Sequence, residues 1–127
     1  MRFIHTADLH LGMKYSSEYP ENVRQKLKED EKTLLLKILS LAEENNISRI
    51  LICGDLFDTH KPDKEIRDFV ISEFGKFNGK IYIIPGNHDF DGPDSVYTAC
   101  SFSENVHIFG SKIELIEEVM IQYLLLT

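Results

Sequence analysis

Residues 50–58 read Ile50-Leu51-Ile52-Cys53-Gly54-Asp55-Leu56-Phe57-Asp58, an apolar run that ends in a glycine and two carboxylates. A short apolar run of this kind is typical of a buried strand. The pattern occurs twice more, because Phe3-Ile4 comes before Asp8-Leu9-His10 and residues 81–84 come before Gly86-Asn87-His88-Asp89. The site of an open parallel sheet lies at the carboxyl ends of its strands. We therefore expect the three polar segments to meet at one edge of one sheet.

The segments between these strands have helical patterns. Apolar residues recur at helical spacing over 21–45 and again after Pro62, where Asp63 is the expected N-cap. Strands that alternate with helices indicate right-handed crossovers, so we predict an α/β class with a mainly parallel sheet, in one domain spanning residues 1–127. The expected strands are 2–7, 48–53, 80–84, 106–109 and 112–117, and a short helix is expected over 93–100. The apolar helix positions are Val23, Leu27, Leu34, Ile38, Leu41 and Ala42, then Ile66, Phe69, Val70 and Phe74.

The composition limits the class of protein. With 14 basic and 21 acidic residues the net charge is −7, which argues against loose binding to a nucleic-acid backbone but allows a phosphate held by metal ions. Cys53 and Cys100 show no CxxC spacing, so neither a disulfide framework nor a zinc–cysteine site is expected. No signal peptide or membrane-length apolar run occurs, and we expect a cytoplasmic protein. The apolar tail over 119–127 is interpreted as a truncation, with a final edge strand as the alternative.

Four polar residues are candidate metal ligands. Asp8 and His10 lie two positions apart on an extended segment, so their side chains point to the same side and can bind one ion. Asp55 follows a glycine at a strand end, and its two carboxylate oxygens can bridge two ions. Asn87 offers a neutral carbonyl oxygen. Carboxylate, amide and imidazole groups together suit a hard or borderline divalent metal.

Three further residues have expected roles beside these ligands. His88 is the candidate catalytic residue, as a general acid or as a stabiliser of the transition state, and Asp89 can orient its ring. Asp58 is expected to accept a hydrogen bond from a loop amide or a ligand imidazole, with a turn or helix cap as the alternative. Two metal ions would clamp the oxygens of an in-line displacement at phosphorus. The sequence contains no GxSxG segment and no GxxxxGK[ST] loop, which excludes serine hydrolases and P-loop nucleotidases.

The other histidines and the aromatic residues near the motifs are weaker candidates. His60 lies in a loop from which it could approach a substrate, whereas His5 and His107 are interpreted as structural. The remaining flanking residues are interpreted as pocket walls or core rather than as readers of bases: Met13, Tyr15, Phe57 and Phe90.

The wording of the motifs carries a family resemblance. Residues 3–12 read Phe3-Ile4-His5-Thr6-Ala7-Asp8-Leu9-His10-Leu11-Gly12, and residues 85–89 read Pro85-Gly86-Asn87-His88-Asp89. With Gly54-Asp55-Leu56-Phe57-Asp58, they resemble the calcineurin-like metallophosphoesterase superfamily. Within that superfamily they are similar to the DNA double-strand-break repair nucleases of the SbcD type. The resemblance covers roughly residues 1–118.

The resemblance implies a fold, an activity and partners. It implies a β-sandwich flanked by helices, of which this chain holds the N-terminal βαβαβ half, and two manganese ions in the site. It also implies nuclease activity on DNA ends, an SbcC-type ATPase partner with coiled-coil arms, and a homodimer as a further option. Asp8 and His10 would bind the first metal, Asp55 would bridge, and Asn87 would bind the second, with His88 beside the reacting phosphate.

The sequence departs from this family in its ligand set. The family supplies further ligands from a later histidine and a Gly-His-x-His segment, whereas this sequence has neither after His107. We therefore expect the chain by itself to be catalytically incomplete. Two other readings stay open at this point. One is another calcineurin-like phosphodiesterase or phosphatase, and the other is a folded fragment or assembly module without catalysis.

Overall fold

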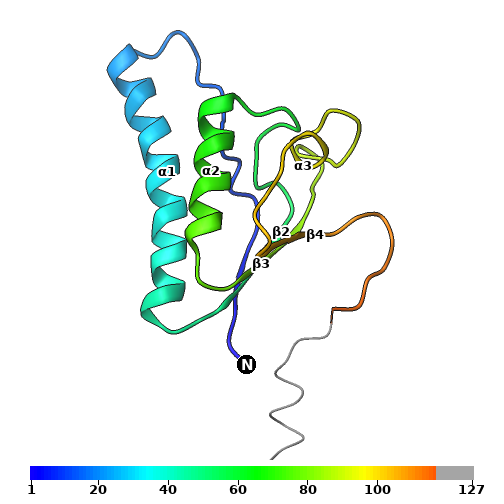
Figure 1. Ribbon diagram of the computed structural model, residues 1–127. Coiled ribbons are helices and arrows are strands. Elements are labelled where there is room, and N and C mark those ends of the chain that lie inside the picture. The colour runs from blue at the N-terminus through cyan, green and yellow to red at the C-terminus, as the bar shows by residue number, and fades with distance from the viewer. Residues whose placement is uncertain (117–127) are drawn as a thin grey trace, which may run out of the picture.

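Four parallel strands form one sheet in the order β1-β2-β3-β4 (Figure 1). The computed structural model describes residues 1–116, so the apolar tail predicted over 119–127 lies outside the described residues. Ile50 of β2 pairs with Ile4 of β1 on one side and with Ile81 of β3 on the other, which aligns the strand ends. The predicted α/β class with a parallel sheet is confirmed. The strands are β1 Ile4–Thr6, β2 Arg49–Cys53, β3 Lys80–Ile84 and β4 Val106–Ile108.

The two long helices lie side by side against one face of the sheet (Figure 1). They are α1, Glu21–Glu44, and α2, Lys64–Lys76, and the short α3, Val96–Ala99, precedes β4. The face toward the long helices carries the most buried strand residues, with Ile50, Ile52, Ile81 and Ile83 each at most 1% exposed. This alternation along the strands places the core between the sheet and the helices.

The buried stripe of α1 differs from the predicted one. Leu35, Leu39 and Ala42 face the core, whereas Leu34 and Leu41 are exposed. Apolar residues occur at both i and i+1 along this helix, so the sequence contains two candidate stripes at helical spacing. Packing against the sheet and α2 selects one of them. Val23, which was also predicted to belong to the apolar stripe of this helix, is exposed as well.

The C-terminal end of α1 and the N-cap of α2 were both predicted from the sequence. Asn45 is the C-cap of α1 and Asn46 adopts a left-handed backbone with φ of 54°, as the predicted helix end at these residues requires. Asp63 is the N-cap residue of α2, as predicted, although its side chain makes no capping hydrogen bond. The predicted stripe of α2 is confirmed, since Ile66, Val70 and Phe74 are buried.

The predicted fifth strand is absent from residues 112–116, and residue 117 lies outside the described part. In this segment the Glu114 carboxylate accepts a hydrogen bond from the backbone N–H of Gly110 and lies 2.8 Å from Nε2 of His107. These contacts hold Glu114 close to the end of β4. Within residues 1–116, no helix is both long enough and apolar enough to cross a membrane.

Candidate metal centre

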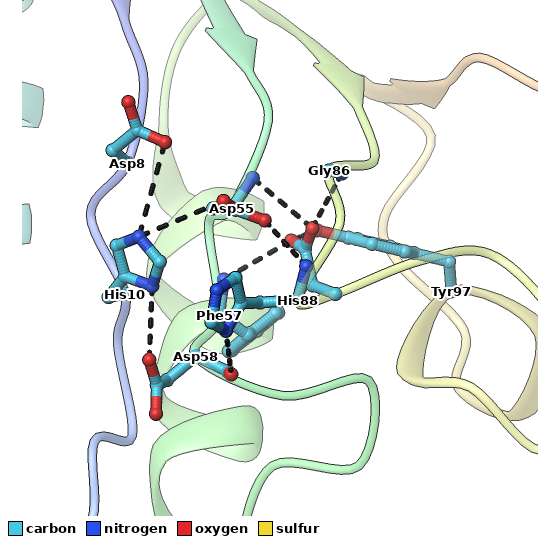
Figure 2. A network of polar contacts seen from close by, with 9 residues as sticks. Asp8, His10, Asp55, Phe57, Asp58, Gly86, His88 and Tyr97 are labelled. Atoms are coloured by element: carbon cyan, nitrogen blue, oxygen red, sulfur yellow. Dashed lines mark hydrogen bonds and ion pairs between the residues drawn. The ribbon is translucent and has the colours of Figure 1, made fainter.

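The three polar segments meet beyond the carboxyl ends of β1, β2 and β3, as predicted (Figure 2). The first two segments run side by side, joined by backbone hydrogen bonds from Asp8 N to Gly54 O and from His10 N to Asp55 O, both 3.0 Å. Leu11 continues this pairing as a parallel bridge to Phe57. The third segment is tied in by the 2.8 Å bond from Gly54 N to Ile84 O. The backbone thus holds three separate parts of the chain at one edge.

Three of the candidate ligands have an uncommon backbone conformation. Asp8, His10 and Asp55 have φ values of 56°, 48° and 51°. Positive φ costs energy for residues other than glycine, although Asp, Asn and His tolerate it best. Such residues persist where the surrounding structure over-determines them, and they cluster at functional sites. All three residues take part in the backbone hydrogen bonds between the first two segments, through Asp8 N, His10 N and Asp55 O.

Asp8, His10 and Asp55 form a group with the geometry of a metal site. The Nε2 atom of His10 lies 4.0 Å from Asp8 Oδ1 and 3.7 Å from Asp55 Oδ2. Oxygen and imidazole ligands lie about 2.0–2.2 Å from an ion such as zinc, so two ligands of one ion are at most about 4.4 Å apart. The two separations from His10 Nε2 satisfy that limit, and the donor set of two carboxylates and an imidazole fits a divalent ion.

Asp58 selects which nitrogen of His10 faces this group. Its Oδ1 lies 3.0 Å from His10 Nδ1 (Figure 2). A carboxylate accepts, so Nδ1 donates to Asp58, and Nε2 is the ring nitrogen that faces Asp8 and Asp55. A carboxylate that orients a ligand imidazole in this way is a common support of metal sites. The contact expected for Asp58 is therefore present, and the capping alternative is unnecessary.

His88 lies beside His10. The two rings meet edge to face with centroids 4.9 Å apart, and His88 Nδ1 is 3.3 Å from the carbonyl oxygen of Asp58. Because a carbonyl accepts, Nδ1 donates, and Nε2 takes no part in this bond. His88, His10 and Asp58 also form a second group whose ligand atoms are within 4.8 Å of one another. Asn87, the remaining candidate ligand, is exposed on the same loop as His88.

Asp89 has a different role from the predicted one. It is fully buried, and the hydrogen bonds that it accepts come from backbone N–H groups and the Tyr97 hydroxyl rather than from the His88 ring. Its Oδ1 accepts hydrogen bonds from the N–H groups of Gly86 and Asp55, at 2.7 and 3.2 Å, and its Oδ2 accepts one from the N–H of Phe57 at 3.2 Å. Asp89 therefore clamps the second polar segment to the third. The sequence places Asp89 next to His88, and this position does not predict hydrogen bonds to the backbone of the second segment.

Tyr97 is a component of the site that sequence reasoning missed. Its phenol donates a hydrogen bond to Asp89 Oδ2 from α3 (Figure 2). Burial, and then the charge of Asp89, raise the pKa of this phenol far above its usual range, so it remains a donor. No local motif marks a tyrosine eight residues after a carboxylate as its partner, and only the fold of the intervening loop joins them.

Asp55 and His88 are linked directly. Asp55 Oδ1 accepts a 2.9 Å hydrogen bond from the backbone N–H of His88, which leaves Oδ2 toward His10. Gly86 allows this approach, because a Cβ atom there would lie 2.3 Å from Asp55 Oδ1 and 2.5 Å from its backbone nitrogen. The glycine of the third segment is thus required by the position of the carboxylate in the second.

The first polar segment is also anchored to α1. Glu31 accepts a 3.0 Å hydrogen bond from the N–H of Gly12 and a 2.7 Å bond from the Tyr15 hydroxyl. Burial and the bond to Glu31 raise the pKa of Tyr15 well above its usual range. Tyr15 was predicted to be a pocket wall or core residue, and the structure shows that it fixes the loop instead.

The remaining predicted histidines lie apart from the candidate ligands. His5 is an exposed residue of β1, and His107 of β4 contacts Tyr82, Phe109 and Glu114. Within residues 1–116, these two belong to neither group of potential metal ligands. Cys53 and Cys100 are free and partly buried.

Comparison with known proteins identifies the class. The calcineurin-like phosphoesterase family matches residues 1–119, and this chain belongs to that family. It is also similar to a protein of Bacillus subtilis (strain 168), the uncharacterized metallophosphoesterase YhaO, with 32% identity over 118 residues. That alignment covers 89% of this chain but 28% of YhaO, so the chain spans less than a third of this relative. The SbcD-type subfamily remains an expectation from the motif wording.

Proposed function

We propose that this chain forms one part of the active site of a metal-dependent DNA nuclease that acts in double-strand-break repair. The observation that carries the hydrolytic part is the convergence of Asp8, His10 and Asp55 beside the ring of His88. Family membership supports phosphoester hydrolysis as the reaction class. The choice of DNA rests on the resemblance of residues 3–12 to SbcD-type nucleases, because the matched relative carries no stated substrate.

The chain's own residues have distinct tasks in this proposal. Asp8, His10 and Asp55 hold the first ion, and Asp55 and Asn87 contribute to a second. Bound divalent ions, of which we propose manganese, would supply Lewis-acid chemistry and activate water. The Nδ1 atom of His88 is engaged by the Asp58 carbonyl, which leaves Nε2 as the ring nitrogen available to the substrate phosphate.

The ligand set is only partly supplied by this sequence. The resemblance implies additional histidine ligands, and residues 108–127 contain no histidine. An incomplete set of ligands binds metal weakly. We therefore propose that full activity requires ligands beyond these 127 residues, from a longer chain or from a second copy.

A substrate panel tests the substrate class. The chain and a longer version that supplies the missing histidines are incubated with Mn²⁺ and linear duplex DNA, a phosphopeptide or a cyclic nucleotide. We expect cleavage of DNA by the longer protein, loss of that cleavage in Asp55→Asn, and little or none by the 127-residue chain. Turnover of the phosphopeptide or cyclic nucleotide with none of DNA would assign a different phosphoesterase.

Asp55→Asn is a suitable test variant because asparagine keeps the shape of the side chain and its local backbone conformation. Asn is tolerated at the φ of 51° found here, and its side-chain carbonyl can still accept the bond from His88 N. The change removes the charge that faces His10 without opening a cavity. Loss of cleavage in this variant would therefore report on the ligand rather than on the fold.

The proposal includes partners and a location. An SbcC-type ATPase and a second copy of the chain are the proposed partners, and the cytoplasm is the proposed location. Exposed apolar residues on α1, Leu34 and Leu41, favour self-association as the alternative, non-catalytic role. Light scattering on the purified chain tests this alternative, and a monomer with Mn²⁺-dependent hydrolysis would contradict it.

A further inference from the structure

His60 and Phe90 form a stacked pair of aromatic rings. Their centroids are 4.2 Å apart and their planes differ by 24°, so the two rings are stacked. For comparison, the centroids of Tyr97 and Phe102 in the core are 6.0 Å apart. Phe90 is nevertheless 46% exposed, so much of its ring remains open to solvent. An aromatic ring that is both stacked and exposed is able to accept another flat group.

The pair lies next to the candidate metal centre. His60 follows Asp58 by two residues and Phe90 follows His88 by two, and two residues span at most about 7 Å. Asp58 and His88 themselves meet, with 3.3 Å between the Asp58 carbonyl oxygen and His88 Nδ1. The stacked rings therefore extend from the same two loops that carry the site.

Hydrogen bonds hold both supporting loops in place. The carbonyl of His60 accepts a 2.7 Å bond from the N–H of the buried Val96. On the other loop, Asp91 accepts a 2.8 Å bond from the Thr98 hydroxyl and lies directly after Phe90. Loops fixed in this way lose little entropy when a ligand binds, so the stacked surface is preorganised.

We propose that His60 and Phe90 form a stacking platform for a nucleobase of the substrate whose phosphate lies at the metal centre. This inference rests on the proposed function and names the part of the substrate that the site would read. A phosphate beside a flat aromatic group is the chemistry of a nucleotide, and every base has a face that can stack on such a platform. The exposed Lys61, the next residue after His60, adds a positive charge for a neighbouring phosphate.

Binding of two matched ligands tests the platform. The 127-residue chain is titrated in calcium, followed by NMR of the His60 and Phe90 rings, with a 5′-phosphorylated thymidine trimer and with an abasic trimer of the same length. We expect the base-bearing trimer to bind about 5- to 150-fold more tightly, the range that one stacked base supplies. The ring protons of Phe90 should shift upfield with that trimer alone.

Three substitutions separate the loss of stacking from general effects on binding. Phe90→Leu keeps an apolar side chain but removes the ring face, and we expect it to abolish most of the preference for the base-bearing trimer. Tyr19→Leu removes another exposed aromatic ring, far from these loops in sequence, and should leave the preference unchanged. His60→Gln provides a second test of the platform, since the bond from Val96 uses only the backbone of residue 60.

The outcomes distinguish this inference from the proposed function. Equal binding of the two trimers, binding of neither, or an unchanged preference in Phe90→Leu would overturn the platform, even if the longer protein cleaves DNA. Tighter binding of a phosphotyrosine peptide than of the thymidine trimer would overturn it as well. A preference for the base-bearing trimer, together with no cleavage of DNA by the longer protein, would support the platform while contradicting the nuclease assignment.

Discussion

Replacing Asp89 by asparagine should destabilise the protein strongly, because this carboxylate is the buried acceptor that joins two of the site's loops. The variant has the same shape, but one of its two acceptor oxygens becomes a donor. If the asparagine oxygen takes the Oδ1 position, the N–H groups of Gly86 and Asp55 keep their acceptor. The N–H of Phe57 then faces the new NH₂ group and has lost its acceptor. The Tyr97 hydroxyl can rotate and accept from the new amide.

The magnitude follows from these contacts. One unsatisfied buried donor costs about 1–3 kcal/mol, and the remaining bonds each lose roughly 1 kcal/mol when the acceptor becomes neutral. Relief from burying a charge offsets part of this sum. We expect a net loss of about 2–4 kcal/mol in the free energy of unfolding, which corresponds to a fall in Tm of about 10–20 °C for a domain of this size.

Urea and thermal unfolding monitored by circular dichroism measure this effect. Asp94→Asn is the matched control, since it makes the same change on an exposed loop residue whose φ of 61° asparagine tolerates. The control should stay within about 0.5 kcal/mol of the parent chain. A similar small effect for Asp89→Asn would refute the view that Asp89 clamps the loops.

Three other predictions concern the same loops. Gly86→Ala should displace the Asp55 carboxylate and cost about 1–3 kcal/mol by overpacking, whereas Gly110→Ala, with nothing within 4 Å, should be neutral in the same unfolding assay. Asp58→Ala should weaken Mn²⁺ binding about 10- to 100-fold in calorimetry through loss of the His10 orientation, and unchanged affinity would argue against that role. Burial raises the pKa of the Tyr97 phenol in the folded state above its value of about 10 in the unfolded chain. The free energy of unfolding should therefore be constant below about pH 10 with respect to this group and fall as the pH rises above it. Tyr97→Phe should flatten that fall in urea unfolding, and an equally steep fall would contradict the assignment.

The parts of the fold that depend on short local patterns were predictable from sequence. The runs before Asp8, Asp55 and Gly86 gave the three strands that carry the site, and the helical spacing of Ile66, Val70 and Phe74 gave the buried face of α2. These patterns succeed because burial on one face determines which residues are apolar.

Other features depended on contacts between distant residues. The sequence of α1 allows two apolar stripes, and only the packing partner decides that Leu35 and Leu39 are buried while Leu34 is exposed. The pairing of Asp89 with Tyr97 and the stacking of His60 on Phe90 are likewise consequences of loop paths. A prediction for His60 or Phe90 alone could not anticipate their joint surface.

Titration of Mn²⁺ into the 127-residue chain tests the central claim most directly, that Asp8, His10 and Asp55 form a metal site. Calorimetry should show binding of Mn²⁺ by the parent chain and a loss of that binding in Asp55→Asn, with an unchanged circular dichroism spectrum. Absence of binding at millimolar Mn²⁺, or equal binding by the Asp55→Asn variant, would contradict the account.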